Sequence, residues 1–193
     1  AGRGRRVDQW QQINSPFLIH TGARFGSGTF RGTETVVDRK RRFIGEDRFK
    51  VDSKGRGSIP ASFRRVLAAG DPDCAEGSHP QVVIVYGDAK RDFLECFTIE
   101  AMDRIQAKIE RMPRASKKRR ALQRLYATHA LTTAVDETGR MVLPAKLRNK
   151  IGLEGEAFFA GTGEAFEIWK PETYDIEMDC DLTADDDFDP DED

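Results

Sequence analysis

Residues 51–64 read Val-Asp-Ser-Lys-Gly-Arg-Gly-Ser-Ile-Pro-Ala-Ser-Phe-Arg, and residues 135–148 read Val-Asp-Glu-Thr-Gly-Arg-Met-Val-Leu-Pro-Ala-Lys-Leu-Arg. The two stretches align without a gap at an offset of 84 residues, and 7 of the 14 positions are identical. Unrelated segments of this length would share roughly one position, so chance is a poor explanation. The chain therefore contains two copies of one supersecondary unit.

Each copy has the pattern of a strand, a turn, a second strand and a helix. In the first copy Phe49 and Val51 alternate with polar residues, which is the period of a half-buried strand. Residues 52–55 predict a turn, because the aspartate accepts backbone N–H groups and the glycine permits a positive φ. Pro60 suits the first position of a helix, and apolar residues recur after it at spacings of three and four. The second copy shows the same order.

Two further apolar runs follow each copy, at 82–86 and 93–97 after the first and at 157–160 and 165–169 after the second. Each unit is too small to bury both of its faces, so we expect the two units to interlock in one shared β-barrel. Apolar residues at helical spacing between the units predict two linking helices. The predicted fold class is mainly β with α (α+β), with a pseudo-twofold axis inside one chain.

These patterns and the distribution of charge divide the chain into five segments. We expect a flexible basic extension (1–42), a first repeat (43–99), linking helices (100–129), a second repeat (130–174) and a disordered acidic tail (175–193). Residues 1–65 hold 15 Lys and Arg against 6 Asp and Glu, whereas residues 175–193 hold 11 acidic residues and no basic one. A basic front half with an acidic tail is typical of a protein that meets a polyanion. A solvated surface with a disordered end explains the charges equally well.

The chain ends and the hydropathy bear on where the protein works. No stretch approaches the roughly 20 uninterrupted apolar residues that cross a bilayer, and residues 1–42 lack the apolar core of a secretory signal. We therefore expect a cytosolic protein with no membrane partner. The first methionine is Met102, so one alternative places the natural start at a non-standard codon near Val36 or Val37, with a translated leader upstream.

The sequence contains no motif that is typical of an enzyme. The three cysteines and three histidines are scattered, so neither a disulfide framework nor a zinc site is indicated. No metalloprotease, P-loop or nucleophile-elbow motif occurs, and a nucleophile, a base and an orienting group cannot be assembled. We expect no catalytic residue, no cofactor, no metal and no small-molecule ligand.

The paired Asp-x-x-x-Arg motifs resemble those of the MraZ family of bacterial transcriptional regulators. The resemblance rests on residues 52–56 with Ile59-Pro60, on residues 136–140 with Leu143-Pro144, and on the flanking stretches 43–45 and 166–169. It covers about residues 43–174. It implies a SpoVT-AbrB-type DNA-binding domain, duplicated in one chain as a swapped-hairpin β-barrel.

The resemblance also implies a function and a set of site residues. It implies a cytoplasmic, nucleoid-associated repressor of the division and cell-wall gene cluster, which binds short direct repeats of promoter double-stranded DNA as a ring-shaped homo-oligomer. The implied DNA-binding residues are Asp52, Lys54, Arg56, Asp136 and Arg140. The second copy has Thr138 where the first has Lys54, so we expect the two turns to bind DNA with unequal strength.

The residues themselves give a physical reason for such a role. An arginine on a tight turn presents its guanidinium on a protruding edge, where it matches two phosphate oxygens or the O6 and N7 atoms of guanine. We expect the aspartate four residues earlier to hold the turn and aim the guanidinium.

Two other interpretations remain open. In the first, each Asp and Arg only brace each other across the hairpin. In the second, the protein is an assembly or partner-binding protein whose DNA contact is secondary. The basic cluster at 117–120 is interpreted as a solvated helix face, with contact to flanking phosphates or to the acidic tail as the alternative.

Overall fold

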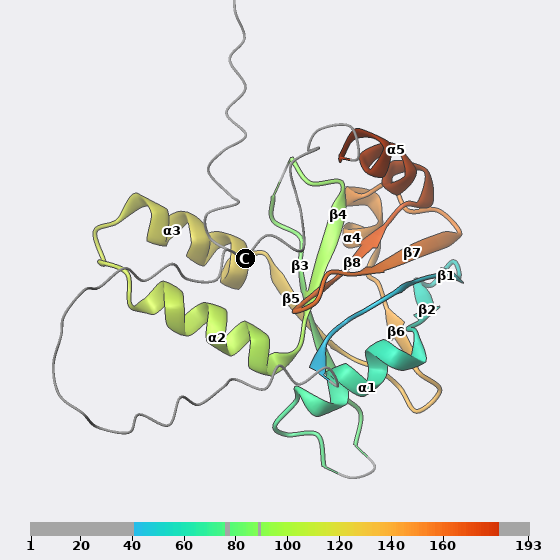
Figure 1. Ribbon diagram of the computed structural model, residues 1–193, viewed down its shortest axis with the longest axis horizontal. Helices are drawn as coiled ribbons and strands as arrows, with labels where there is room; N and C mark the ends of the chain where they lie inside the picture. The colour runs from blue at the N-terminus through green and yellow to red at the C-terminus, as the bar shows by residue number, and fades with distance from the viewer. Residues whose placement is uncertain (1–40, 76–77, 89, 182–193) are drawn as a thin grey trace, which may run out of the picture. The chain divides into compact units, whose positions relative to one another are not determined.

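The computed structural model describes residues 41–75, 78–88 and 90–181 (Figure 1). The expectations for the N-terminal extension, apart from residues 41–42, and for the tail beyond residue 181 lie outside the described residues. So does the alternative start near Val36 or Val37.

The two repeats have the same order of elements. The first contains β1 (Glu46–Lys50), β2 (Arg56–Ser58), α1 (Ala61–Ala69), β3 (Gln81–Val85) and β4 (Phe93–Phe97). The second contains β5 (Ala130–Ala134), β6 (Arg140–Val142), α4 (Ala145–Lys150), β7 (Glu156–Gly161) and β8 (Phe166–Trp169). The order strand, turn, strand, helix, strand, strand is thus as predicted from the sequence.

Helices follow each repeat. Between the repeats lie α2 (Ile99–Glu110), α3 (Lys117–Gln123) and a single π-helical segment, Arg124–Thr128, and α5 (Pro171–Asp181) comes after the second. Helix α2 begins where the Thr98 hydroxyl accepts the backbone N–H of Ala101, and α3 begins where Ser116 accepts that of Arg119. These are ordinary N-caps, which satisfy amides that have no partner inside the helix.

The repeats exchange strands. In the described part of the chain, eight strands form a six-stranded antiparallel sheet, in the order β1-β7-β8-β4-β3-β5, and a two-stranded ribbon of β2 and β6. Strand β1 of the first repeat pairs with β7 of the second, and β5 of the second pairs with β3 of the first. In the central β4–β8 pair Glu95 lies opposite Glu167, which marks the pseudo-twofold axis. The α+β fold and the interlocking of the two units are therefore confirmed.

The pairing does not close into a continuous barrel in the described part of the chain. The sheet and the ribbon are joined by the turns and by one isolated bridge between Val51 and Gly57. Each ribbon strand is only three residues long, because Pro60 and Pro144 follow, lack an N–H group and begin helices α1 and α4. The expected barrel is thus an open sheet with a separate ribbon.

The core between sheet, ribbon and helices draws equally on both repeats. Four phenylalanines pack together, with the Phe166 ring centroid 5.0 Å from that of Phe43, 5.2 Å from Phe63 and 6.2 Å from Phe159. All four are at most 1% exposed. Neither repeat can bury this surface alone, so the packing holds the exchanged strands in place.

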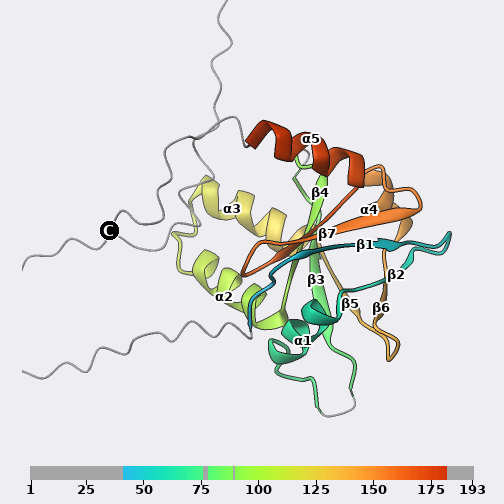
Figure 2. The same cartoon turned by 45° about the vertical axis from the view of Figure 1, so that its right-hand side comes forward.

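The outer face of the sheet is covered by helices from two directions. Figures 1 and 2 show α2 and α3 on one side of the sheet, with the β2–β6 ribbon on the other. Val83, Val85 and Phe97 of the sheet form a second buried cluster with Met102 of α2.

Helix α5 corrects the expectation that the tail is disordered from residue 175. The helix runs to Asp181, so residues 175–181 are ordered. The ring centroid of Tyr174 lies 4.1 Å from that of Phe158 and 5.7 Å from that of Trp169, and Arg48 pairs with Asp175 at 3.3 Å. The acidic composition predicts disorder for these residues, but the packing of the Tyr174 ring holds the helix against the sheet.

The core predicts a stability difference between two substitutions. Phe166→Ala removes a ring that is fully buried against three others, so it should lower the free energy of unfolding by about 3–5 kcal/mol. Ile176→Ala, at a side chain that is 65% exposed on α5, should change it by at most about 0.5 kcal/mol. Urea unfolding measures both. Equal effects would contradict the assigned core.

Candidate nucleic-acid interface

The turn between β1 and β2 is organised by one carboxylate. Oδ1 of Asp52 accepts the backbone N–H groups of Lys54 and Arg56, each at 2.9 Å, and Oδ2 accepts Nε of Arg56 at 2.7 Å. The Arg56 side chain is 51% exposed. In the described residues its Nη1 and Nη2 groups donate to no protein acceptor, so they are free for a ligand. The expected aspartate that holds the turn and aims the guanidinium is present here.

The turn between β5 and β6 differs in one respect. Oδ1 of Asp136 accepts the backbone N–H groups of Thr138 and Arg140 at 2.9 and 2.8 Å, but the third bond comes from the Thr138 hydroxyl at 2.7 Å. Among the described residues no ion pair joins Asp136 to Arg140, which is exposed. The threonine hydroxyl has taken the place that the guanidinium holds in the first turn. Arg140 is therefore less constrained than Arg56.

Each turn closes on the other repeat through its glycine. Gly55 has a φ of 82° and Gly139 a φ of 76°, which L side chains rarely adopt. The Gly55 carbonyl accepts the N–H of Leu143 at 2.7 Å, and the Gly139 carbonyl accepts that of Ile59 at 2.9 Å. A Cβ on Gly55 would collide with the Leu143 carbonyl. The motif glycines thus form the turns and also join the two repeats.

The β2–β6 ribbon places the two arginines on one face. Arg56 pairs with Val142 and Ser58 pairs with Arg140, with Gly57 opposite Met141 between them. Because side chains alternate across a strand, these two outer pairs point to the face opposite Met141, which is 1% exposed. Diagonal neighbours across an antiparallel pair are about 7–8 Å apart, so the two guanidinium groups start from positions close to each other. We call this face, made of Arg56, Ser58, Arg140 and Val142, the ribbon face.

Two further arginines lie against the turns, and sequence reasoning gave them no role. Arg148 of α4 donates from Nε to the Leu143 carbonyl at 3.1 Å and from Nη2 to the Ser53 carbonyl at 3.4 Å, across the two repeats. Its counterpart Arg64 of α1 lies against Gly139 of the other turn. Both are the last identical position of the 14-residue repeat, which was the available signal.

A hollow of about 440 Å³ lies beside the first turn. It is lined by Val51, Asp52, Ser53, Arg148, Asn149, Leu153, Glu154 and Gly155.

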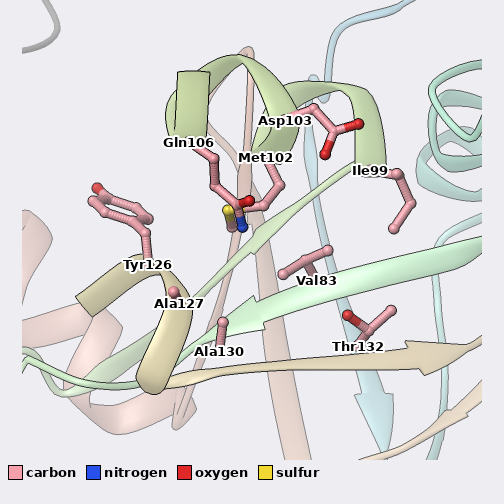
Figure 3. A pocket seen from close by; sticks show the side chains of 9 residues that line it. All are labelled: Val83, Ile99, Met102, Asp103, Gln106, Tyr126, Ala127, Ala130 and Thr132. Carbon is pink, nitrogen blue, oxygen red and sulfur yellow. The ribbon is translucent and has the colours of Figure 1, made fainter. Parts of the chain in front are cut away.

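A second hollow, of about 270 Å³, lies far from both turns in the fold. It is lined by Val83, Ile99, Met102, Asp103, Gln106, Tyr126, Ala127, Ala130 and Thr132, from α2, the π-helical segment and strands β3 and β5 (Figure 3). Burial raises the pKa of Tyr126 to about 12, so its phenol is neutral at physiological pH.

Over the described ranges, no three His, Cys, Asp or Glu residues are grouped to hold a metal, and no helix has the length and apolar character to cross a membrane.

The basic cluster at 117–120 lies on α3, away from the ribbon (Figures 1 and 2). Nη1 of Arg119 donates to the Met112 carbonyl at 2.7 Å, at the end of α2. The side chains of Lys117, Lys118 and Arg120 are exposed. This arrangement agrees with a solvated helix face and separates the cluster from the two turns.

Different donors lower the pKa values of the two carboxylates. The backbone N–H of Arg56, then its guanidinium, holds the pKa of Asp52 below 3.8, whereas the Thr138 hydroxyl, then the backbone N–H of Arg140, lowers that of Asp136. Both carboxylates therefore stabilise their turns above pH 3.8, and this is lost as the pH falls through the lower pKa of the folded state. We expect Arg56→Ala to raise the pKa of Asp52 but leave it below 3.8, because the backbone donors remain.

Carboxyl ¹³C shifts, followed by NMR across the acid range, measure both groups. Thr138→Ala is the matched control, and should raise the pKa of Asp136 without changing that of Asp52. An Asp52 pKa that is unchanged in Arg56→Ala would contradict the ion pair.

Comparison with known proteins gives consistent similarities. A family model described as "MraZ protein, putative antitoxin-like" matches residues 126–187. A protein of Ruegeria pomeroyi named "Transcriptional regulator MraZ" is 61% identical over 137 residues, which are 71% of this chain and 82% of that protein. Proteins of the same name from Cereibacter sphaeroides and Nitrosomonas europaea are 48% identical over 143 residues and 34% identical over 141 residues. They are covered over 84% and 89% of their lengths, and cover 70% and 73% of this chain.

Proposed function

Because the chain belongs to the MraZ family, and is therefore a transcriptional regulator and not an enzyme, we propose that it acts by placing the ribbon face in the major groove of promoter DNA. The observation that carries this proposal is the position of Arg56 and Arg140 on one exposed face of a two-stranded ribbon. The major groove of B-DNA is about 12 Å wide and admits such a ribbon, whereas the minor groove, at about 6 Å, would have to be widened first.

The proposed roles of the five predicted residues follow from their contacts. Arg56 binds a guanine through its free Nη groups, while Asp52 holds its Nε and limits the rotamers that it would lose on binding. Lys54 is exposed beside it and binds a phosphate as a point charge. Arg140, held less firmly, binds a base or a phosphate, and Asp136 shapes its turn.

Magnitudes support an assembly of several subunits. One bidentate arginine discriminates between bases by about 1–3 kcal/mol, which is too little to select a promoter among a genome of competing sites. Several copies that bind successive short direct repeats raise the effective concentration of each later contact. We therefore propose a ring-shaped homo-oligomer on promoter repeats, acting as a repressor of the division and cell-wall gene cluster.

The proposed division of labour follows the repeats. Residues 43–99 and 130–174 form the DNA-binding unit, residues 100–129 link them, and the basic extension and acidic tail flank the unit. Such a protein works in the cytoplasm at the nucleoid.

Arginine substitutions test the proposal on DNA from upstream of the protein's own gene. Arg56→Ala should weaken specific binding at least tenfold, since the contact is worth about 1–3 kcal/mol in each subunit. The matched control is Arg104→Ala, at an α2 arginine whose side chain is 53% exposed. Footprinting and fluorescence anisotropy measure the affinity. If linker changes such as Leu125→Ala abolish binding and Arg56→Ala has no effect, the assembly alternative is favoured.

The unequal turns predict a gain of function in salt titrations. The logarithm of the binding constant falls by about 0.9 per phosphate contact for each tenfold rise in salt. Lys54→Ala should make the slope shallower by about this amount per subunit bound, and Thr138→Lys, which copies the first turn into the second, should make it steeper. A slope that is the same in both variants would show that the turns do not meet the phosphates.

A further inference from the structure

The ribbon face carries one exposed apolar side chain. Four large apolar residues are exposed in the described part of the chain: Ile44, Val142, Ile176 and Met178. Val142, 46% exposed, is the one of these four that lies on the β2–β6 ribbon, where it faces Arg56 directly. An apolar group between two cations adds nothing to phosphate binding, so the charge of this face does not explain it.

Val142 also breaks the pseudo-twofold symmetry of the ribbon. The equivalent position in the first repeat is Ser58, which lies opposite Arg140. One half of the ribbon face therefore presents an arginine and a valine across from each other, and the other half an arginine and a serine. A reader with identical halves favours a palindrome, because its symmetry is matched by the DNA. Unequal halves favour a site that has a direction.

The register places Val142 close to the base that Arg56 reads. Directly opposed residues of an antiparallel pair have Cβ atoms about 4.5–5.5 Å apart, and base pairs are stacked about 3.4 Å apart. The apolar group that the major groove offers is the C5 methyl group of thymine. The valine side chain matches this methyl group in size and polarity, whereas a serine hydroxyl forms hydrogen bonds with several bases.

Resting on the proposed function, we propose that Val142 reads the C5 methyl group of a pyrimidine, thymine in unmodified DNA, within one or two base pairs of the guanine bound by Arg56. Ser58 gives the other half of the ribbon no such preference. The valine thus sets the direction in which each subunit lies on its DNA repeat. A valine kept only because a β-branched residue suits a strand would make no such distinction.

The test removes single methyl groups from the DNA. A duplex that the full chain selects from a randomised library is remade with each thymine replaced in turn by deoxyuridine, and the affinities are measured by fluorescence anisotropy. Wild-type protein should lose about fourfold in affinity per subunit at one position, the value for one buried methyl group. Val142→Ser, which copies the first repeat, should lose this sensitivity. Ile176→Ala, at an exposed apolar residue away from the ribbon, should keep it.

A second arm separates the methyl group from the rest of the base pair. The sensitive thymine is replaced by cytosine and by 5-methylcytosine, with guanine opposite in both duplexes. Wild-type protein should bind the methylated duplex about fourfold more tightly, and Val142→Ser should bind both equally. An equal affinity of the wild-type protein for both duplexes would contradict the proposal.

An exchange variant tests the direction. In Ser58→Val/Val142→Ser the sensitive thymine should move towards the other end of the site, because the two residues are diagonal on the ribbon. A sensitive position that stays in place assigns the methyl contact elsewhere and overturns the inference.

The proposed function fails separately. If the wild-type protein selects no duplex from the library, DNA recognition itself is wrong. If it selects one in an Arg56-dependent manner but no deoxyuridine effect depends on Val142, only this inference is wrong.

Discussion

The pairing of β2 with β6 is the contact on which the candidate site depends. Each strand is three residues long and belongs to a different repeat, so neither copy of the motif can form the ribbon alone. The buried Met141 opposite Gly57 fixes which face points inward, and the hydrogen bonds from Leu143 and Ile59 to the motif glycines hold the turns against each other. A one-residue slip of either strand would turn its arginine towards the core. The shared aromatic core resists that slip because it fixes the strands that lead into each turn.

Much of the fold follows from the sequence because the repeat is long and its punctuation is strong. The aspartate, glycine and proline at fixed spacing predict the turn, the short strand and the helix in both copies. The residues alone predicted the exchange of strands only as an interlocking, since alternation along β1 does not say whether β3 or β7 is its partner; the swapped hairpins were implied by the family resemblance. The sheet stays open because the ribbon strands are short. Their length depends on how the chain packs after Pro60 and Pro144. Helix α5 was not predicted because its acidic residues are typical of a disordered tail. The packing of Tyr174 against the sheet, which holds the helix, is visible only in the structure.

The site shows how two identical motif positions diverge in structure. Asp52 and Asp136 accept hydrogen bonds from equivalent backbone N–H groups, but only Asp52 also accepts one from the guanidinium of its arginine. In the second turn the Thr138 hydroxyl donates to Asp136 instead, and Lys54 has no such hydroxyl. The substitution was visible in the sequence, whereas its effect on the arginine was not. Arg64 and Arg148 were visible as repeated residues, but their role across the repeats needs the exchanged topology. The two turns therefore differ in charge and in how firmly their arginines are held, and the two halves of the ribbon face differ in polarity.

Methylation of bound DNA by dimethyl sulfate tests most directly whether this face enters the major groove. The reagent modifies guanine at N7, in the major groove, and adenine at N3, in the minor groove. The account predicts that the wild-type protein protects guanine N7 atoms at its binding site, that Arg56→Ala loses protection at one guanine of each repeat, and that adenine N3 stays reactive. Protection of adenine N3 alone, or guanine protection that persists unchanged in Arg56→Ala, would contradict it.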